Sequence, residues 1–412
     1  MTRSTTPSRA KAGPSWPLGG LVFASVLVAV AAGAGTPLLS LYQREWGFPL
    51  WQLTVAFAVY AVALLATLLV AGSLSDHVGR RPVLLGALCF MILASCLFWI
   101  DNQIGWVIAA RAIQGVATGA ATSTFSAAII ELSSERRRSL MTVITSAAPV
   151  GGLALGAFVT GLATDLVHDP TKLVFSTLAA GFLIGIVCVL AARETSALSP
   201  GAVRSLRPRL VVLDQARSWF VAVVPLVAAG WMFSGLFLGL APTFDRTKFG
   251  LDSGALNGVI VALQPAAAAI FGLVFSRVQP QRSALTGAAF SLAGAVVAVV
   301  GLATGQLLIV AIGAVIGGAG QGAGFGASLR ILAPLADNTA RGGLLAATYL
   351  VAYASYGIPV LISGTLANLI DLTAIVLVYG VVVAIFAACA LISISILRTR
   401  AKPTAGHLVA RG

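Results

Sequence analysis

The sequence predicts an all-α integral membrane protein with twelve transmembrane helices in two sets of six, and three observations carry this prediction. Hydrophobic residues make up 58% of the chain and charged residues only 9%, whereas soluble proteins carry about 25% charged residues. Twelve apolar runs are each long enough to cross a bilayer, which takes about 20 residues. A polar segment at 193–218 divides these runs into two groups of six.

The apolar runs also define the expected domain organisation. The sequence indicates a polar tail at 1–16, a six-helix bundle at 17–192, a linker at 193–218, a second six-helix bundle at 219–397 and a tail at 398–412. The twelve spans are expected at 17–42, 50–73, 83–100, 104–130, 140–164, 172–192, 219–243, 255–276, 284–304, 306–332, 343–368 and 372–397. The first run is too long for the apolar core of a signal peptide, so we expect it to be retained.

Lysine and arginine residues are distributed unevenly over the loops between these runs. Of the 26, 21 fall on the side of the two tails and four on the other side. Because basic loops stay on the cytoplasmic side of a membrane, we expect a multi-pass protein of the cytoplasmic membrane with both termini in the cytoplasm. This topology accounts for the net charge of +13, so the charge does not indicate a nucleic-acid partner.

Cysteine and histidine residues show no pattern of a metal or catalytic site. The four cysteines all fall inside apolar runs, and the three histidines are scattered over loops and the C-terminal tail. No Cys-x-x-Cys or His-Glu-x-x-His spacing occurs, and no histidine accompanies a serine within a span. We therefore expect no metal, no cofactor and no enzymatic activity.

The loop at 72–82 is short, charged and rich in glycine. Gly79 permits a tight reversal of the chain, and Asp76 can complement a helix N-terminus. Arg80 and Arg81 are the kind of charge that stays in the cytoplasm. An ordinary basic turn between two membrane helices is one interpretation of this loop.

The same loop resembles a family signature. The residues Gly72, Leu74, Asp76, Gly79, Arg80 and Arg81 match the loop that joins the second and third helices of the major facilitator superfamily, and His77 stands where that family usually has arginine. The resemblance implies a secondary transporter whose two halves move around a central site. It also implies that protons drive the transport of a small molecule.

An acid at the end of the fourth span adds to the resemblance. In the superfamily such an acid can pair with the arginine of the signature loop, which implies a contact between Glu131 and Arg80. The alternative is that Glu131 and Glu135 only neutralise the basic cluster at 136–138.

The resemblance further implies a latch between the two halves. Asp76 would face the N-terminus of the eleventh span near Arg341, where helix-end amides favour an anion. Gly72 would let the second and eleventh helices approach closely. Together with the loop arginines, these residues would hold the halves together at the cytoplasmic side in the outward-facing state.

Arg111 is the one basic residue well inside an apolar run. A charge at this depth is costly and usually faces a cavity or a partner. Arg111, Gln114 and Gly115 resemble a motif that the superfamily associates with proton coupling. The alternative is that Arg111 lies near the outer end of its helix and extends to the membrane interface.

The fifth span carries a proline among small residues. Pro149, Gly151, Gly152 and Gly156 resemble the Gly-Pro-Gly-Gly motif of antiporters in the superfamily, although Ala148 replaces the first glycine and the glycine pair comes one residue early. Proline bends helices and glycine permits close packing. The segment therefore indicates either antiport or a packing kink unrelated to the direction of transport.

The resemblance places the substrate cavity between the first, fourth, seventh and tenth spans, with further lining from the second, fifth, eighth and eleventh. Polar or aromatic residues in mid-span are candidates for its lining: Thr122, Thr145, Trp231, Phe233, Gln264, Gln321, Tyr349, Tyr353 and Tyr356. Plain helix packing is the alternative for each of them. All thirteen acids are expected at span ends or in loops, which disfavours a cation exporter and fits neutral, aromatic or weakly anionic substrates.

The expected function is proton-coupled efflux of a small organic compound, either drug-like or a metabolite. The alternative is proton-coupled uptake of a small metabolite such as a sugar or an organic acid. The expected partners are the substrate, protons and the lipid bilayer, and we expect a monomer.

Overall fold

The computed structural model describes residues 16–100, 103–196, 198, 200–206, 210–337 and 341–400. Within this part, twelve helical segments are long and apolar enough to cross a membrane. The predicted all-α architecture with twelve spans is therefore confirmed.

The first bundle contains six long helices and a short one in the signature loop. The long helices are α1 (Trp16–Trp46), α2 (Leu50–Ala71), α4 (Arg80–Trp99), α5 (Ile104–Leu132), α6 (Glu135–Leu166) and α7 (Pro170–Ala191). The short helix α3 (Leu74–Val78) lies between α2 and α4, and the short helix α8 (Ala202–Ser205) lies in the linker.

The second bundle begins with a long segment made of α9 (Asp214–Gly235), the π-helical turn η1 (Leu236–Leu240) and α10 (Ala241–Phe249). The remaining long helices are α11 (Gly254–Val274), α12 (Pro280–Thr304), α13 (Leu307–Leu332), α14 (Arg341–Leu366) and α15 (Leu372–Arg400). Short 3₁₀ turns, η2 (Phe275–Arg277) and η3 (Ala333–Leu335), follow α11 and α13.

Several helices are longer than the apolar runs that predict them. Helix α6 begins at Glu135 rather than at 140, and the seventh span extends from Asp214 to Phe249 rather than over 219–243. Polar residues at helix ends continue the backbone hydrogen bonding beyond the apolar run, so hydrophobicity alone underestimates helix length. Gly250, with φ of +65°, ends α10 in the left-handed conformation that glycine adopts easily. The domain boundaries stay predictions.

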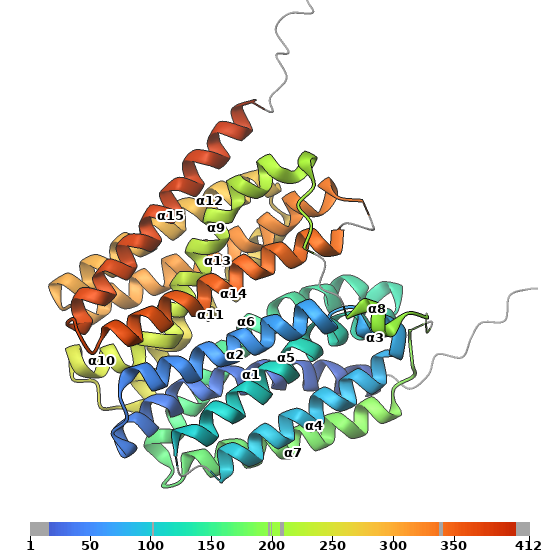
Figure 1. The fold of residues 1–412 in the computed structure, drawn as a ribbon, viewed down its shortest axis with the longest axis horizontal. Helices are drawn as coiled ribbons and strands as arrows, with labels where there is room; N and C mark the ends of the chain where they lie inside the picture. The colour runs from blue at the N-terminus through green and yellow to red at the C-terminus, as the bar shows by residue number, and fades with distance from the viewer. Residues whose placement is uncertain are drawn as a thin grey trace, which may run out of the picture.

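The two bundles lie side by side and contact each other mainly through two helix pairs, α2 with α14 and α6 with α11 (Figure 1). Figure 1 shows α3 and α8 at one end of the molecule, which we call the basic end, and α10 at the other, which we call the opposite end. The bundles diverge toward the basic end and come together near the opposite end.

Small residues allow the close approach near the opposite end. A Cβ atom built on Gly161 of α6 would lie 2.6 Å from the Cα of Gly258 on α11, and one built on Gly364 of α14 would overlap the side chain of Thr54 on α2. In a membrane, helices associate by packing at such small residues rather than by hydrophobic burial. Close packing of α6 on α11 and of α14 on α2 therefore contributes to closing the opposite end.

Candidate functional site: a cavity between the bundles

A cavity lies between the two bundles, lined by α1, α2, α5 and α6 of the first bundle and by α9 and α14 of the second. Its volume is about 80 Å³, which is below the range of about 300 to 1,000 Å³ that is typical of pockets for drug-sized ligands. A compound of that size therefore needs the bundles to move apart before it fits.

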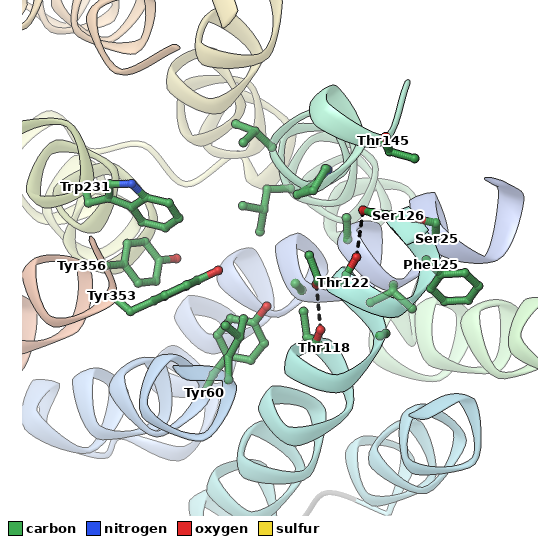
Figure 2. A pocket seen from close by; sticks show the side chains of 18 residues that line it. Ser25, Tyr60, Thr118, Thr122, Phe125, Ser126, Thr145, Trp231, Tyr353 and Tyr356 are labelled. Atoms are coloured by element: carbon green, nitrogen blue, oxygen red, sulfur yellow. Dashed lines mark hydrogen bonds between the residues drawn. The ribbon is translucent and has the colours of Figure 1, made fainter. Parts of the chain in front are cut away.

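Aromatic rings form one wall of this cavity. Trp231 of α9 and Tyr353 of α14 have ring centroids 4.9 Å apart, and Tyr356 lies edge-on to Trp231 at 5.8 Å. Tyr60 of α2 adds a ring from the first bundle (Figure 2). The indole Nε1 of Trp231 has no hydrogen-bond partner among the described residues. The wall thus offers flat apolar surface together with polar groups at the ring edges.

Hydroxyl groups form the facing wall. Thr118, Thr122 and Ser126 follow each other at intervals of four residues on α5, so they share one face of the helix. Each hydroxyl donates to the carbonyl four residues earlier, at 2.7 to 2.9 Å. Because the proton of each hydroxyl is used within the helix, its oxygen remains an acceptor for a ligand.

Arg111 lies behind this cavity and is buried, with 1% of its surface exposed. Its Nη1 donates to the Oε1 of Gln114 at 2.7 Å and to the carbonyl of Ala32 at 3.3 Å. Its guanidinium carbon lies 4.2 Å from the ring centroid of Tyr60. The interpretation that Arg111 extends to the membrane interface is therefore wrong.

Gln114 and two glycines fix the arginine between three helices. Gln114 donates from Nε2 to the carbonyl of Ala31 on α1 at 2.8 Å. A Cβ atom on Gly115 would lie 2.5 Å from the carbonyl oxygen of Tyr60, and one on Gly35 would lie 2.9 Å from the Nη1 of Arg111. The structure thus brings Arg111, Gln114 and Gly115 together at the α1–α2–α5 junction, while their role in proton coupling stays a prediction.

The glycines of the fifth span pack α6 against its neighbours. Cβ atoms on Gly152 and Gly156 would lie 2.4 Å from the Cβ of Ala29 and 2.1 Å from the carbonyl oxygen of Val30, both on α1. Gly151 instead faces α11, and Pro149 lines the cavity. Close packing against α1 thus accounts for two of these residues, and their bearing on antiport stays a prediction.

The structure places five of the nine predicted lining residues on the cavity. These are Thr122, Thr145, Trp231, Tyr353 and Tyr356. The sequence interpretation missed several others: Ser25, Tyr60, Thr118, Phe125 and Ser126. The spacing of Thr118, Thr122 and Ser126 would have revealed the hydroxyl face of α5.

The other four predicted lining residues are packed elsewhere. Gln264 and Gln321 are buried between α11 and α13, where the Nε2 of Gln264 donates to the Oε1 of Gln321 at 2.6 Å. Phe233 packs on Gly317 inside the second bundle. Tyr349 lies beside Phe325, with ring centroids 5.7 Å apart. These helices are apolar on all sides, so the sequence did not indicate which face meets the cavity.

The signature loop is held by ion pairs at the basic end. Arg80 pairs with Asp76 at 2.6 Å and with Glu131 at 3.0 Å. The contact between Arg80 and Glu131 is thus present as expected. Glu135 pairs with Arg138 at 3.1 Å, so part of the alternative, neutralisation of the basic cluster, is present as well.

Among the described residues, Gly72 and Arg341 do not form the contacts expected of them between this loop and the eleventh span. Arg341 donates from Nε to the carbonyl of Ala333 in its own bundle, at 3.1 Å. A Cβ atom on Gly72 would meet the carbonyl of Leu68 in its own helix and no atom of α14 within 4 Å. The expectation that Gly72 lets α2 and α14 approach is therefore wrong for this conformation, because the bundles diverge at this end. The latch itself stays a prediction.

Glu194, which the sequence interpretation did not single out, also fixes the loop. Its carboxylate accepts hydrogen bonds from the backbone amides of Arg80 at 2.8 Å and Arg81 at 3.0 Å. Partial burial raises the pKa of Glu194, but the amides of Ser196, Arg81 and Arg80 outweigh this effect, so its pKa is lowered overall. A carboxylate with a lowered pKa stabilises the fold above its ordinary range and loses this contribution as the pH falls through the lowered value.

We therefore expect the loop to loosen as the pH falls through the range below about 4.5, the ordinary pKa of a glutamate. Hydrogen exchange of the Arg80 and Arg81 amides, corrected for the intrinsic effect of pH, should speed up over this range. Glu194→Gln should already show fast exchange at neutral pH. Glu135→Gln, which changes an exposed acid away from the loop, is the control. Slow exchange in Glu194→Gln would contradict the role of this carboxylate.

The opposite end is closed by polar contacts between the bundles. Asp165, in the last turn of α6, accepts from the Oγ of Ser253 at 2.7 Å and from the amides of Gly254 and Ala255 at 2.6 and 3.0 Å. It thus caps the N-terminus of α11 from the other bundle, where the helix dipole favours an anion. Gln43 and Thr243 form a second contact at 3.0 Å.

One acid departs from the expectation that all thirteen lie at span ends or in loops. Asp245 lies within the described seventh span and is 1% exposed. The expectation was wrong here because α10 continues the helix beyond the apolar run that ends at 243.

Two six-helix bundles around a central cavity define the fold class of secondary transporters with two related halves. A family model described as Major Facilitator Superfamily matches residues 21–308. The chain belongs to the major facilitator superfamily.

Curated relatives carry the name multidrug resistance protein MdtL. The protein of that name from Shewanella sp. (strain ANA-3) is 26% identical over 214 residues, which are 51% of this chain and 52% of the relative. Its namesake from Salmonella paratyphi B (strain ATCC BAA-1250 / SPB7) is 31% identical over 150 residues, 35% of this chain and 36% of the relative. The chain thus spans about half the length, or less, of these curated relatives.

Solved structures share the fold over almost the whole chain. A POT family transporter in complex with 5-aminolevulinic acid has a TM-score of 0.74 at 14% identity and covers 95% of this chain and 98% of its own. The human organic anion transporter MFSD10 (TETRAN) has a TM-score of 0.63 at 16% identity, with 92% and 99% covered. At these identities the likeness shows the fold.

Proposed function

We propose that this protein is a secondary transporter of the cytoplasmic membrane that exports a small organic compound in exchange for protons. The observation that carries the proposal is the cavity between the two bundles, with an aromatic wall and a hydroxyl wall. The names of the curated relatives support export of drug-like compounds.

The cavity also bears on the class of compound. The described residues that line it include no carboxylate, and the guanidinium of Arg111 lies directly behind Tyr60. The aromatic rings favour flat apolar groups, and the hydroxyl oxygens accept hydrogen bonds. A neutral or weakly anionic aromatic compound that carries a hydrogen-bond donor fits this lining better than a cation does.

The two ends of the molecule supply the alternation that transport needs. With the basic end in the cytoplasm, as the distribution of arginines predicts, the described conformation is closed to the outside by Asp165 and Ser253. The resemblance assigns the signature loop to a latch with α14; in the described conformation a Cβ atom on Gly72 meets no atom of α14 within 4 Å, and Arg341 bonds within its own bundle. A second conformation, with the opposite end open and the signature loop latched to α14, would open the cavity to the outside.

A matched pair of substitutions tests whether export uses this cavity. Thr122→Val removes a hydroxyl from the cavity wall, and Thr177→Val removes an exposed one on α7 that donates to its own helix in the same way. Loss of one hydrogen bond to a substrate costs about 0.5 to 1.5 kcal/mol, which is about a twofold to twelvefold change in half-saturating concentration.

The measurement is the efflux rate of a neutral, fluorescent aromatic compound from cells that carry each variant. We expect slower efflux at low substrate concentration with Thr122→Val and an unchanged rate with Thr177→Val. Equal efflux rates in both variants would show that the compound does not use this cavity during export. Entry of the compound instead of exit would establish the alternative, uptake.

A further inference from the structure

Asp245 is a buried acid close to the contact that closes the opposite end. It lies four residues before the end of α10, which is about 6 Å of helix, and 1% of its surface is exposed. Thr243, two residues earlier, forms the contact with Gln43 of the first bundle. The acid therefore lies where α10 meets the other bundle in the closed state.

The carboxylate lacks a partner in this position. Its Oδ2 is enclosed and accepts no hydrogen bond from any described residue, and no described cation forms an ion pair with it. A charged acid usually has such partners when it is buried. Asp165, by contrast, is exposed and accepts three hydrogen bonds.

No charged residue among the described residues of the elements that pack on α10 forms an ion pair with Asp245. The elements that pack on α10 are η1, α1, α11 and α15. Helix α1 ends with the exposed Arg44 and Glu45, whereas η1 and α11 contain no charged residue and α15 carries its arginines at the far end.

Two cations on α10 itself also face away from Asp245. Arg246 lines a small polar cavity together with Arg44 and Asp165, and adjacent residues on a helix do not face each other. Lys248 is exposed and interacts electrostatically with Asp371 in the loop before α15.

An ionised carboxylate in such a place is unfavourable for two reasons. Burial of a charge without a partner costs several kcal/mol, and proteins avoid this cost by neutralising the group. The C-terminal end of a helix carries the negative end of its dipole, which further disfavours an anion near it. The protonated acid is neutral, so neither effect disfavours it.

We propose that Asp245 takes up a proton from the outside solution when the opposite end closes and releases it when that end opens. In the open state the carboxylate would lie in water and be ionised; in the closed state it is protonated and buried between the bundles. No covalent bond other than O–H changes, and water on that side supplies the proton. The inference rests on the proposed alternation between two states and adds the residue that makes this alternation depend on the outside pH.

Protonation of Asp245 and protonation of Asp165 should change the ratio of closed to open molecules in opposite directions. Protonation of Asp245 favours closure, so the ratio of closed to open molecules should rise as the pH falls, by up to about tenfold per pH unit for one linked proton. Protonation of Asp165 would weaken its contacts with the N-terminus of α11 and favour opening instead. A rise in closure at low pH therefore cannot come from Asp165.

Distances between spin labels at the opposite end measure this equilibrium without any substrate. Labels on His168→Cys and Leu308→Cys, both exposed and in different bundles, would be used in full-length protein whose native cysteines are replaced by alanine. The distance distribution would be recorded in lipid nanodiscs between about pH 5 and about pH 8.

We expect the wild-type distances to shift toward the closed state at low pH. Asp245→Asn, which resembles the protonated acid, should be mostly closed at every pH, and Asp245→Leu should behave in the same way if it is the charge that matters. Asp252→Asn, an exposed acid in the loop after α10, should keep the wild-type response.

An unchanged pH response in both Asp245 variants would overturn the proposal, and so would a wild-type protein whose distances do not depend on pH. A merely structural role would lower thermal stability without removing the pH response. If the protein proves to be an importer, the proposed direction of transport fails while this linkage stands, because the measurement does not involve the direction of transport.

Discussion

Arg111→Ala is expected to abolish proton-driven transport while the protein still reaches the membrane. The substitution removes the donor to Gln114 and to the carbonyl of Ala32, and it removes the cation from the ring of Tyr60. Each buried acceptor left without a donor costs about 1 to 3 kcal/mol. Because Tyr60 lines the cavity, the loss acts directly on the transport site.

Arg111→Lys separates charge from geometry. Lysine keeps a positive charge but lacks the planar fork that reaches two acceptors and stacks on a ring, so we expect a partial loss. Arg282→Ala changes an exposed arginine at the start of α12 and should transport normally. The measurement is the transport rate as a function of pH in membrane vesicles with equal amounts of each variant. A wild-type pH profile in Arg111→Ala would contradict a coupling role.

Gly156→Leu is expected to prevent folding of the first bundle. A Cβ atom at this position would lie 2.1 Å from the carbonyl oxygen of Val30 and 2.9 Å from the amide nitrogen of Ala34, both in the backbone of α1. Neither atom can move without displacing the helix. Overpacking of a tight core costs about 1 to 3 kcal/mol even where side chains can adjust, so the cost here should exceed that range.

Gly86→Leu is the matched control, because a Cβ atom on Gly86 of α4 meets no described atom within 4 Å. Both variants replace a helical glycine by the same residue, so their intrinsic helix propensities change equally. Yield and a monodisperse elution profile in detergent measure the outcome. A well-folded Gly156→Leu protein with the thermal stability of Gly86→Leu would show that α1 and α6 do not pack as the structure has them.

The architecture could be predicted from the sequence because hydrophobic length is a direct physical requirement of the bilayer. The contact between Arg80 and Glu131 could be predicted as well, because a short loop offers few arrangements and the resemblance names the partner. The ends of the spans were less predictable: Asp245 was expected, like the other acids, at a span end or in a loop, whereas α10 buries it. The apolar run ends before the helix does, and hydropathy does not detect this.

The lining of the cavity was predictable only in part, for a reason that lies in the helices themselves. Thr122 and Trp231 face the cavity, whereas Gln264 and Gln321 bond to each other between α11 and α13. A polar residue in mid-span can either face a cavity or form hydrogen bonds with another buried side chain. The rotation of a helix that is apolar on all sides depends on packing against its neighbours, which the sequence of one helix does not express.

The proposed alternation of the two ends and its coupling to protons can be tested most directly in everted membrane vesicles, whose interior corresponds to the outside of the cell. Energised vesicles become acidic inside, and a neutral fluorescent aromatic compound is supplied outside them. Proton-coupled export predicts that the compound accumulates inside against its own gradient and that its addition releases protons from the vesicles. Accumulation that persists after the pH gradient is dissipated, or movement of the compound out of the vesicles together with protons, would contradict the account.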